Sequence, residues 1–439
     1  MGHGQNDLAN RHGLIRRLSV HYIDQGQASV LANEDLSHVR SLTVTASACI
    51  KHLPSLVDFE ALRVLDFQGC QNVQEYDMND IDKLFQLKYL SFRDTDMREL
   101  PSGIVRLYSL ETLDLSNTCI EELPPEIVQL IKLQHLLIAR YYNMYSDRHF
   151  CLEGRTKIPD GIGNMRNLRV ISGFNVTKSS LSAVKELGNL TALNELNLQL
   201  DGGGSQEYKR HEEMLLSSLC KLGGCKLQSL WIRAANSTPL QFLDSWSPLP
   251  SSLQRFRMIA NYDFPEMPKW ITPKLTRLAH LDINLVEITE EVLRILGEMR
   301  ALLSLLLSFK GAQNERIIVR GHSFPCLKEF YLFISSSGTR PTYLKFEEGA
   351  MPKLEKLDVP FFVSVAKAYG FNLGINHLPC LKHADVILDN RHATSSESKA
   401  AAAAAIRNEA NAHSNHPRVF IIGEMEEDAE GSYTDEEEG

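Results

Sequence analysis

The sequence lacks the patterns that secreted scaffolds, metalloproteins and membrane proteins require. Its eight cysteines are scattered and form no CxxC pair, so neither a zinc site nor a disulfide framework is expected. No run reaches the roughly 18 apolar residues of a membrane-spanning helix. The first segment, MGHGQNDLANRHG, is too polar for a secretory signal. We therefore predict a cytoplasmic protein with no metal and no membrane segment.

Motifs of catalysis and nucleotide binding are also missing. The chain contains no GxxxxGK[ST], HExxH, GxSxG or HRDxxxxN motif. The glycine run at 202–204 is not followed by Gly-Lys-Ser/Thr, so it predicts a linker rather than a phosphate loop. None of the fifteen histidines stands at the spacing of a metal site or a catalytic triad. We expect no enzyme activity and no cofactor.

The net charge of −9 comes from one segment. Residues 424–439 hold nine acidic residues and no Lys or Arg, which leaves 46 acidic against 46 basic residues elsewhere. A neutral body argues against nucleic-acid or membrane binding. We expect the acidic tail, 423–439, and the polar segment 1–13 to be disordered.

One internal repeat dominates the rest of the chain. LETLDLSNTCIEELPPEIVQL at 110–130 matches LKYLSFRDTDMRELPSGIVRL at 87–107, with an apolar residue opposite every leucine and isoleucine. The triplet Leu-x-x-Leu-x-Leu, or a close variant, recurs in about fifteen units, mostly 23 to 27 residues apart. This is the signature of leucine-rich repeats.

Each part of the repeat has a physical role. The Leu-x-Leu alternation predicts a short strand with its leucines pointing inward. Cys70, Thr95 and Thr118 stand at the following bend, where a small polar side chain can bond unpaired backbone groups. The Leu-Pro pair ends the turn, and Ile-x-x-Leu predicts a short helical or 3₁₀ return. No unit can bury its leucines alone, so neighbouring units must stack.

We predict an α/β leucine-rich repeat solenoid, a horseshoe with a parallel sheet on its concave face, over residues 14–390. Insertions near 140–157 and 201–224 are expected on one rim, the second with a helix from Glu212 to Leu222 capped by Gly223. Over 391–422 a C-terminal helix–strand cap is predicted, with a helix from the Thr394–Glu397 capping box to about Ala412 and a strand at RVFII. With the preceding strand ADVILDN it forms a strand–helix–strand unit.

The predicted strands present a ladder of outward-facing residues, which is the candidate binding surface. Trp, Tyr and Arg are the residues most enriched in binding hot spots. The ladder also includes Ala139 and Phe174. Two interpretations stay open, because such side chains bind either a partner protein or inserted loops of the same chain. The candidates are Trp231, Arg233, Arg255, Arg257, Tyr331 and Phe333 in the ladder, and Arg140, Tyr141 and Tyr142 in the first insertion.

The copies with Thr or Cys at the bend, the entry LIRRLSVH at 14–21 and the ending LPCLKHADVILDN resemble one family. They are similar to the repeat region of grass nucleotide-binding leucine-rich-repeat immune receptors of the coiled-coil type. That resemblance implies intracellular detection of pathogens. The partner is then an effector, a monitored host protein or the receptor's own nucleotide-binding domain.

The sequence departs from the receptors in one respect, because the coiled coil and the nucleotide-binding module are absent from it. A truncated receptor, a fragment and a stand-alone repeat protein are all compatible with this departure. The function predicted is a non-catalytic protein-binding module of plant defence. The alternative is a general intracellular scaffold or adaptor built on the same repeats.

Overall fold

The chain forms two compact units, unit 1 (Met1–Leu253) and unit 2 (Gln254–Gly439). The computed structural model describes residues 15–21, 31, 34–45, 47–143, 150–202, 205–234, 238–312, 315–335, 340–389 and 395–423. The two segments predicted to be disordered, 1–13 and 423–439, lie outside these residues apart from Gly423.

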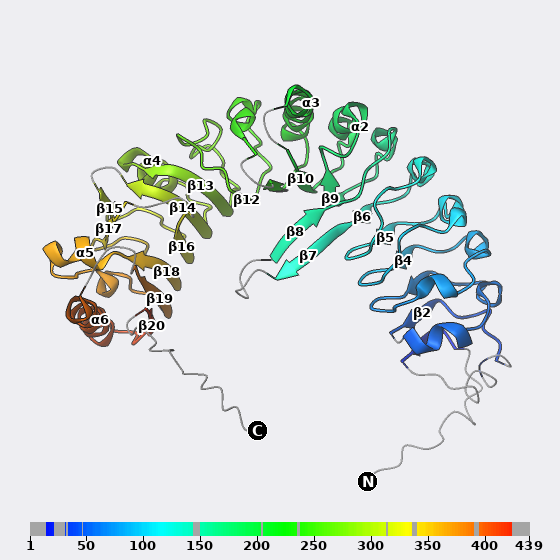
Figure 1. The fold of residues 1–439 in the computed structure, drawn as a ribbon, viewed down its shortest axis with the longest axis horizontal. Helices are drawn as coiled ribbons and strands as arrows, with labels where there is room; N and C mark the ends of the chain where they lie inside the picture. Colours follow the sequence, from blue (N-terminus) through cyan, green and yellow to red (C-terminus); the bar gives the residue numbers. More distant parts are fainter. Residues whose placement is uncertain are drawn as a thin grey trace, which may run out of the picture. The chain divides into compact units, whose positions relative to one another are not determined.

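The sheet of unit 1 is parallel, and its strands follow one another in chain order (Figure 1). Each strand is three to six residues long, as the repeat predicts. Within the described residues the strands are β1 (Arg17–Val20), β2 (Ser41–Val44), β3 (Val64–Asp66), β4 (Tyr89–Ser91), β5 (Thr112–Asp114), β6 (His135–Leu137), β9 (Val170–Asn175), β10 (Glu195–Leu200) and β11 (Ser229–Ala234).

The predicted inward leucines form a continuous row through unit 1. Pairing places the central leucine of each strand beside that of the next, and all of them are fully buried. The row consists of Leu42, Leu65, Leu90, Leu113, Leu136, Ile171, Leu196 and Leu230. Each repeat thus covers the apolar face of its neighbour.

The bends after β4 and β5 are held as predicted. Thr95 Oγ1 donates to Phe92 O at 2.7 Å and Thr118 Oγ1 to Leu115 O at 2.8 Å. The chain then returns along the outer side in short helices, mostly 3₁₀. These are η1 (Ser47–His52), η2 (Leu56–Asp58), η3 (Val73–Glu75), η4 (Ile81–Lys83), η5 (Ser102–Arg106), η6 (Pro125–Gln129), η7 (Ile162–Asn164), α2 (Leu181–Glu186), η8 (Leu187–Asn189) and η9 (Gln241–Ser245).

The two insertions take different forms. The first is an antiparallel hairpin of β7 (Ala139–Asn143) and β8 (Phe150–Gly154), which projects from the strand side of unit 1 (Figure 1). The second contains α3 (Gln206–Gly223), so the helix predicted from Glu212 begins six residues too late. Ser205 caps it by accepting from Tyr208 N at 3.0 Å, and Gly224 rather than Gly223 is its C-cap.

The predicted outward position of Phe174 is wrong. Gly173 adopts φ +91°, and the register of β9 against β10 slips by one residue there. Phe174 then pairs with Leu198 and is fully buried. A bulge of this kind reverses the face of every following residue, which period-two counting cannot anticipate.

Unit 2 repeats the parallel arrangement and ends in the predicted cap of strand β19 (His383–Leu388), helix α6 (Ser396–Asn411) and strand β20 (Arg418–Ile422). The described elements are β12 (Arg255–Ala260), β13 (His280–Ile288), α4 (Glu290–Gly297), β14 (Ser304–Ala312), β15 (Arg316–Val319), β16 (Glu329–Ile334), β17 (Tyr343–Phe346), β18 (Lys356–Phe361), α5 (Val363–Ala366), η11 (Lys367–Tyr369), η12 (Ile375–His377), β19 (His383–Leu388), α6 (Ser396–Asn411) and β20 (Arg418–Ile422). Among the described residues, β15 and β17 form a separate two-stranded sheet.

One carboxylate ties the cap helix to the repeat before it. Glu409 of α6 accepts backbone N–H bonds from Leu373, Gly374 and Ile375 at 2.8 to 2.9 Å, at the start of η12. At the start of α6, Ser395 Oγ accepts from Ser398 N at 3.2 Å. Thr394, placed in the predicted capping box, lies outside the described residues.

Candidate protein-binding surface

Alternate residues of each strand in unit 2 turn away from the core and line up across the sheet. The strands pair in register, so one outward residue of each lies beside that of the next, at the roughly 4.8 Å spacing of paired strands. The row reads Arg257, Asp282, Leu306, Tyr331, Asp358, Asp385 and Phe420. This row combines aromatic, apolar and acidic side chains on one face.

The most exposed apolar residues of this face are ones that the sequence analysis missed. Phe420 is 60% exposed and Ile422 52% exposed, both on β20. Tyr331 and Phe333 on β16, which were predicted, are half-buried. RVFII was interpreted only as a closing strand, although its alternation already put Phe420 and Ile422 on a single face.

Arg257 forms an ion pair within unit 2. Its Nε lies 3.2 Å from Asp282 Oδ2 on the next strand, and both side chains are largely buried. Burial raises the pKa of Asp282 to about 7, although Arg257 acts in the opposite direction. Arg255, two residues earlier on β12, is exposed.

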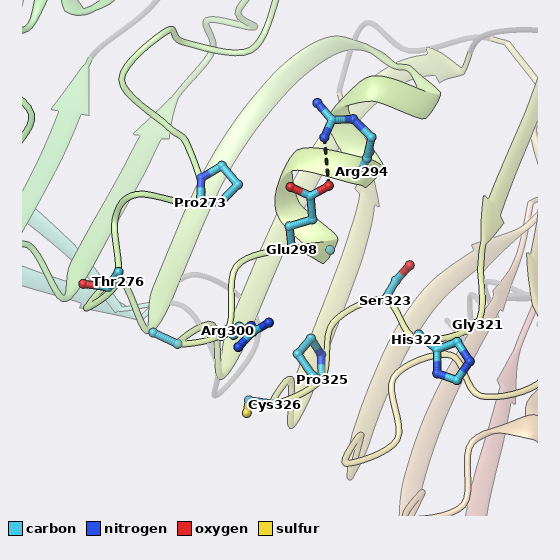
Figure 2. Close-up of a pocket in the computed structure, with 12 residues that line it drawn as sticks. Pro273, Thr276, Arg294, Glu298, Arg300, Gly321, His322, Ser323, Pro325 and Cys326 are labelled. Carbon is cyan, nitrogen blue, oxygen red and sulfur yellow. Dashed lines mark hydrogen bonds and ion pairs between the residues drawn. The ribbon is translucent and has the colours of Figure 1, made fainter.

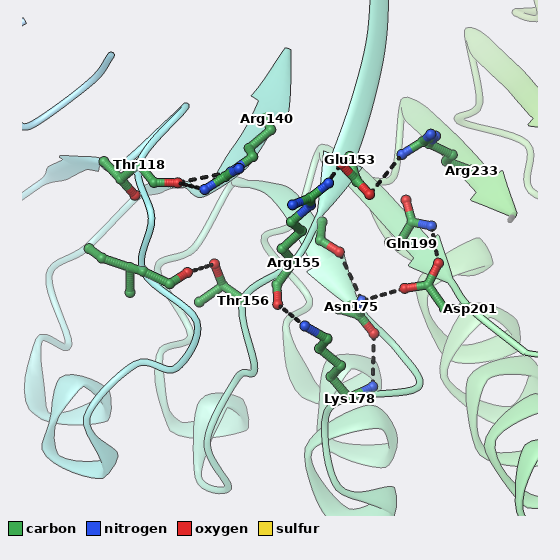
Figure 3. A network of polar contacts seen from close by, with 12 residues as sticks. Thr118, Arg140, Glu153, Arg155, Thr156, Asn175, Lys178, Gln199, Asp201 and Arg233 are labelled. Carbon is green, nitrogen blue, oxygen red and sulfur yellow. Dashed lines mark hydrogen bonds and ion pairs between the residues drawn. The ribbon is translucent and has the colours of Figure 1, made fainter. Parts of the chain in front are cut away.

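In unit 1 the base of the hairpin covers part of the outward ladder. A Cβ at Gly154 of β8 would lie 2.3 Å from Gly173 O and 3.0 Å from the side chain of Gln199. Glu153 Oε1 lies 3.5 Å from Arg233 Nη1, so Arg233 is engaged by the hairpin (Figure 3). Arg233 therefore has an ion-pair partner within unit 1.

Asn175 fastens the hairpin base to the sheet, a role that sequence reasoning missed. Its Nδ2 donates to Gly154 O and to Asp201 Oδ2, both at 2.8 Å. Its Oδ1 accepts from Lys178 N, also at 2.8 Å (Figure 3). The side chain is fully buried, so this amide satisfies backbone groups where the hairpin meets β9.

The remaining candidates of unit 1 are Arg140, Tyr141, Tyr142 and Trp231. Arg140 donates from Nε and Nη2 to Thr118 O at 2.9 and 2.6 Å, an intramolecular bond that fixes the start of the hairpin (Figure 3). Tyr141 and Tyr142 lie in β7, and their side chains are outside what the structure describes. Trp231 is half-buried on β11, and its Nε1 donates to Ser229 Oγ at 3.1 Å.

Trp231 and Arg233 belong to unit 1, whereas Arg255, Arg257, Tyr331 and Phe333 belong to unit 2. The predicted single surface through all of them stays a prediction. Ala139, predicted to face outward, is fully buried against the backbone of Gly173.

Within the described residues, the side chains form no cluster suited to metal binding. No group of three or more His, Cys, Asp or Glu side chains gathers there. A depression beside the C-terminal end of α4 is lined by Arg294, Glu298, His322 and Cys326, among others (Figure 2). Arg294 is paired to Glu298 at 2.8 Å and to Glu291 at 2.6 Å, so its charge is already compensated.

Among the described helices, none is both long enough and apolar enough to cross a bilayer.

Comparison with known proteins decides the family. The model of the family described as "Leucine-rich repeat region" matches residues 38–419. The chain belongs to this leucine-rich repeat family. A solved leucine-rich-repeat protein of Leptospira interrogans has the same fold, with a TM-score of 0.53 at 15% identity over 92% of this chain and 95% of that one. The predicted α/β repeat solenoid is thereby confirmed.

The leucine-rich repeats of this chain are similar to those of rice proteins. Disease resistance protein RGA5 of Oryza sativa subsp. japonica is 30% identical over 93% of this chain and 35% of that protein. Disease resistance protein Pik-2 is 27% identical over 93% of this chain and 42% of its own length. The predicted resemblance to the repeat region of grass resistance proteins is confirmed, and the chain spans only about two fifths or less of these relatives.

Proposed function

We propose that this chain is a non-catalytic protein-binding module of plant defence. Its partner docks on the outward side chains of the strands and is a pathogen effector or a host protein. The observation that carries the proposal is the face of unit 2, where Tyr331, Phe333, Phe420 and Ile422 lie outside the leucine core. The names of the rice relatives support the defence context.

The chemistry of that face suits protein recognition. Aromatic side chains bury large areas at low entropic cost and dominate binding hot spots. Tyr331, Phe333, Phe420 and Ile422 therefore favour a partner that presents apolar side chains.

A second class of partner follows from the length of the relatives. The repeats match 35% of Disease resistance protein RGA5, so most of that protein lies outside the match. We therefore include the rest of a resistance protein, with its nucleotide-binding domain, among the candidate partners. The predicted cytoplasmic location is part of this proposal.

Proximity labelling in leaves tests the proposal. The tagged full chain, wild type or Phe420→Ser, is expressed in rice leaves with and without pathogen challenge, and labelled proteins are quantified. We expect a set of proteins that Phe420→Ser reduces about tenfold, in line with a hot-spot side chain. Lys274→Ala, at an exposed side chain before β13, is the matched control and should retain the labelling.

The outcome also separates defence from general scaffolding. A defence module gains partners on challenge, or binds the part of RGA5 outside the match in a pull-down. A general adaptor holds the same partners in challenged and unchallenged leaves. Identical labelling by wild type and Phe420→Ser would remove the proposed surface.

A further inference from the structure

The turn after each outer helix has the same geometry in three successive repeats of unit 1. The backbone N–H of residues 85, 108 and 131 donates to the carbonyl two residues earlier at 2.8 to 2.9 Å. Phe85 is 70% exposed, Tyr108 55% and Ile131 56%. We name these three residues the apolar stripe.

The core does not explain these side chains. In each repeat the residue before the stripe position and the residue two after it are fully or almost fully buried, as with Leu107 and Leu110 around Tyr108. The same position holds Glu60 in the preceding repeat and Arg166 and Thr191 in the following ones, so the turn itself accepts polar residues. Single exposed apolar residues are ordinary, but three at equivalent positions of adjacent repeats form a patch.

The spacing of the stripe matches an α-helix. Three residues after each stripe position the repeats are joined by backbone bonds, such as Glu111 N to Lys88 O and Gln134 N to Glu111 O, both 2.8 Å. Adjacent stripe residues therefore follow the roughly 4.8 Å spacing of paired strands, slightly widened on the outer side. A helix advances about 5.4 Å per turn, so residues i, i+4 and i+7 of one helix can each meet one stripe residue.

Basic side chains lie at one end of the apolar stripe. Arg166 occupies the stripe position of the repeat after Ile131, and Lys132 and Arg169 lie beside it in sequence. All three are exposed, and none forms an ion pair with any other residue that the structure describes. At the Phe85 end, by contrast, Arg106 is paired to Asp82 at 3.0 Å. Uncompensated positive charge therefore collects at the Ile131 end of the stripe.

We propose that the apolar stripe binds an amphipathic helix of another protein. Three apolar residues of that helix, on successive turns, cover Phe85, Tyr108 and Ile131, and an acidic residue on the next turn meets Arg166. The carboxylate of Glu60, at the same turn position of the preceding repeat, disfavours an anionic membrane as the occupant. This site is separate from the strand face of the proposed function and does not depend on it.

A designed helix tests the site on the full chain. The probe is a fluorescein-labelled peptide of about 20 residues with Leu at i, i+4 and i+7 and Glu at i+11, followed by fluorescence anisotropy. We expect binding by wild type, a loss of about tenfold in affinity for Tyr108→Ser, and no change for Thr191→Ala, the same turn position in another repeat. Circular dichroism confirms that both variants fold.

A charge exchange distinguishes this site from unspecific apolar binding. Arg166→Glu should weaken the Glu-bearing peptide and strengthen a peptide with Lys at i+11. The proposal is overturned if wild type does not bind the probe, if Tyr108→Ser binds it equally well, or if the exchange has no effect. Binding to phosphatidylcholine vesicles containing phosphatidylserine that is lost in Tyr108→Ser would assign the stripe to a membrane and also overturn it.

Discussion

Arg257 and Asp282 form a largely buried ion pair between β12 and β13, with Nε and Oδ2 3.2 Å apart. The side chain of Asp282 is only 14% exposed, and its pKa is raised to about 7 because burial outweighs the attraction of Arg257. The carboxyl group is therefore partly protonated near neutral pH, on a face where Arg257 was a candidate for partner binding.

The pH dependence of stability follows from this pair. Between the unfolded pKa of 3.8 and the folded pKa of about 7, the folded chain holds a proton that the unfolded chain has lost. Stability should therefore fall as pH rises through this range, by roughly 4 kcal/mol in all, and level off above it. Urea denaturation from pH 4 to 9 measures this, and Asp282→Asn should remove that part of the slope. Parallel curves for the two proteins would contradict the assigned pKa.

Arg257→Ala should destabilise unit 2 rather than simply remove a contact with a partner. At pH 8 the variant must hold Asp282 without Arg257, either ionised or protonated well above its usual pKa, at a cost of about 3 kcal/mol. At pH 5 Asp282 already carries a proton in the wild type, so the loss should be smaller. Thermal denaturation at both pH values checks the order, and Arg255→Ala, at an exposed arginine of the same strand, is the control. A larger loss at pH 5 would refute the argument.

Glu409→Gln should loosen the C-terminal cap. The carboxylate accepts three backbone N–H bonds at 2.8 to 2.9 Å, and an amide offers one oxygen and no charge in its place. We expect a loss of roughly 2 kcal/mol in the free energy of unfolding, measured by urea denaturation. Glu348→Gln, at an exposed side chain, should be neutral. Equal stability of the two variants would show that Glu409 does not hold the cap.

Gly173→Ala and Gly69→Ala should differ, although both glycines have positive φ. At Gly173 a Cβ would approach the Ala139 backbone to 2.7 Å, whereas at Gly69 nothing lies within 4 Å. We expect about 1 kcal/mol for Gly69→Ala, from backbone strain alone. Gly173→Ala should cost about 3 kcal/mol or more, since the bulge and the hairpin base must also shift. Equal melting temperatures of the two variants would mean that the hairpin base does not pack tightly against Gly173 of β9.

The repeat frame could be predicted because its causes are local. Leu113 and Leu115 follow the alternation of one extended stretch, and Thr118 bonds a carbonyl three residues away. The turn of helix that contains Ile127 then leads the chain back. Each of these contacts recurs at a fixed sequence distance, so counting positions was enough. The capping strand at RVFII followed from the same alternation.

The candidate surface was predicted less completely, because its state depends on distant segments. In the sequence, Arg233 and Arg140 cannot be told apart from arginines that bind a partner. In the structure Arg233 pairs with Glu153, and Arg140 donates to Thr118 O. Phe174 is buried rather than outward-facing because Gly173 introduces a bulge in β9 where the hairpin packs.

The sequence by itself determined which leucines of the repeat face the core, because burying them against the next repeat is the only way to cover them. The tertiary structure decided which outward residues are left for a partner. An outward side chain is no longer available when an inserted hairpin or a neighbouring strand pairs with its charge or covers it. The pattern of a single repeat does not contain this information.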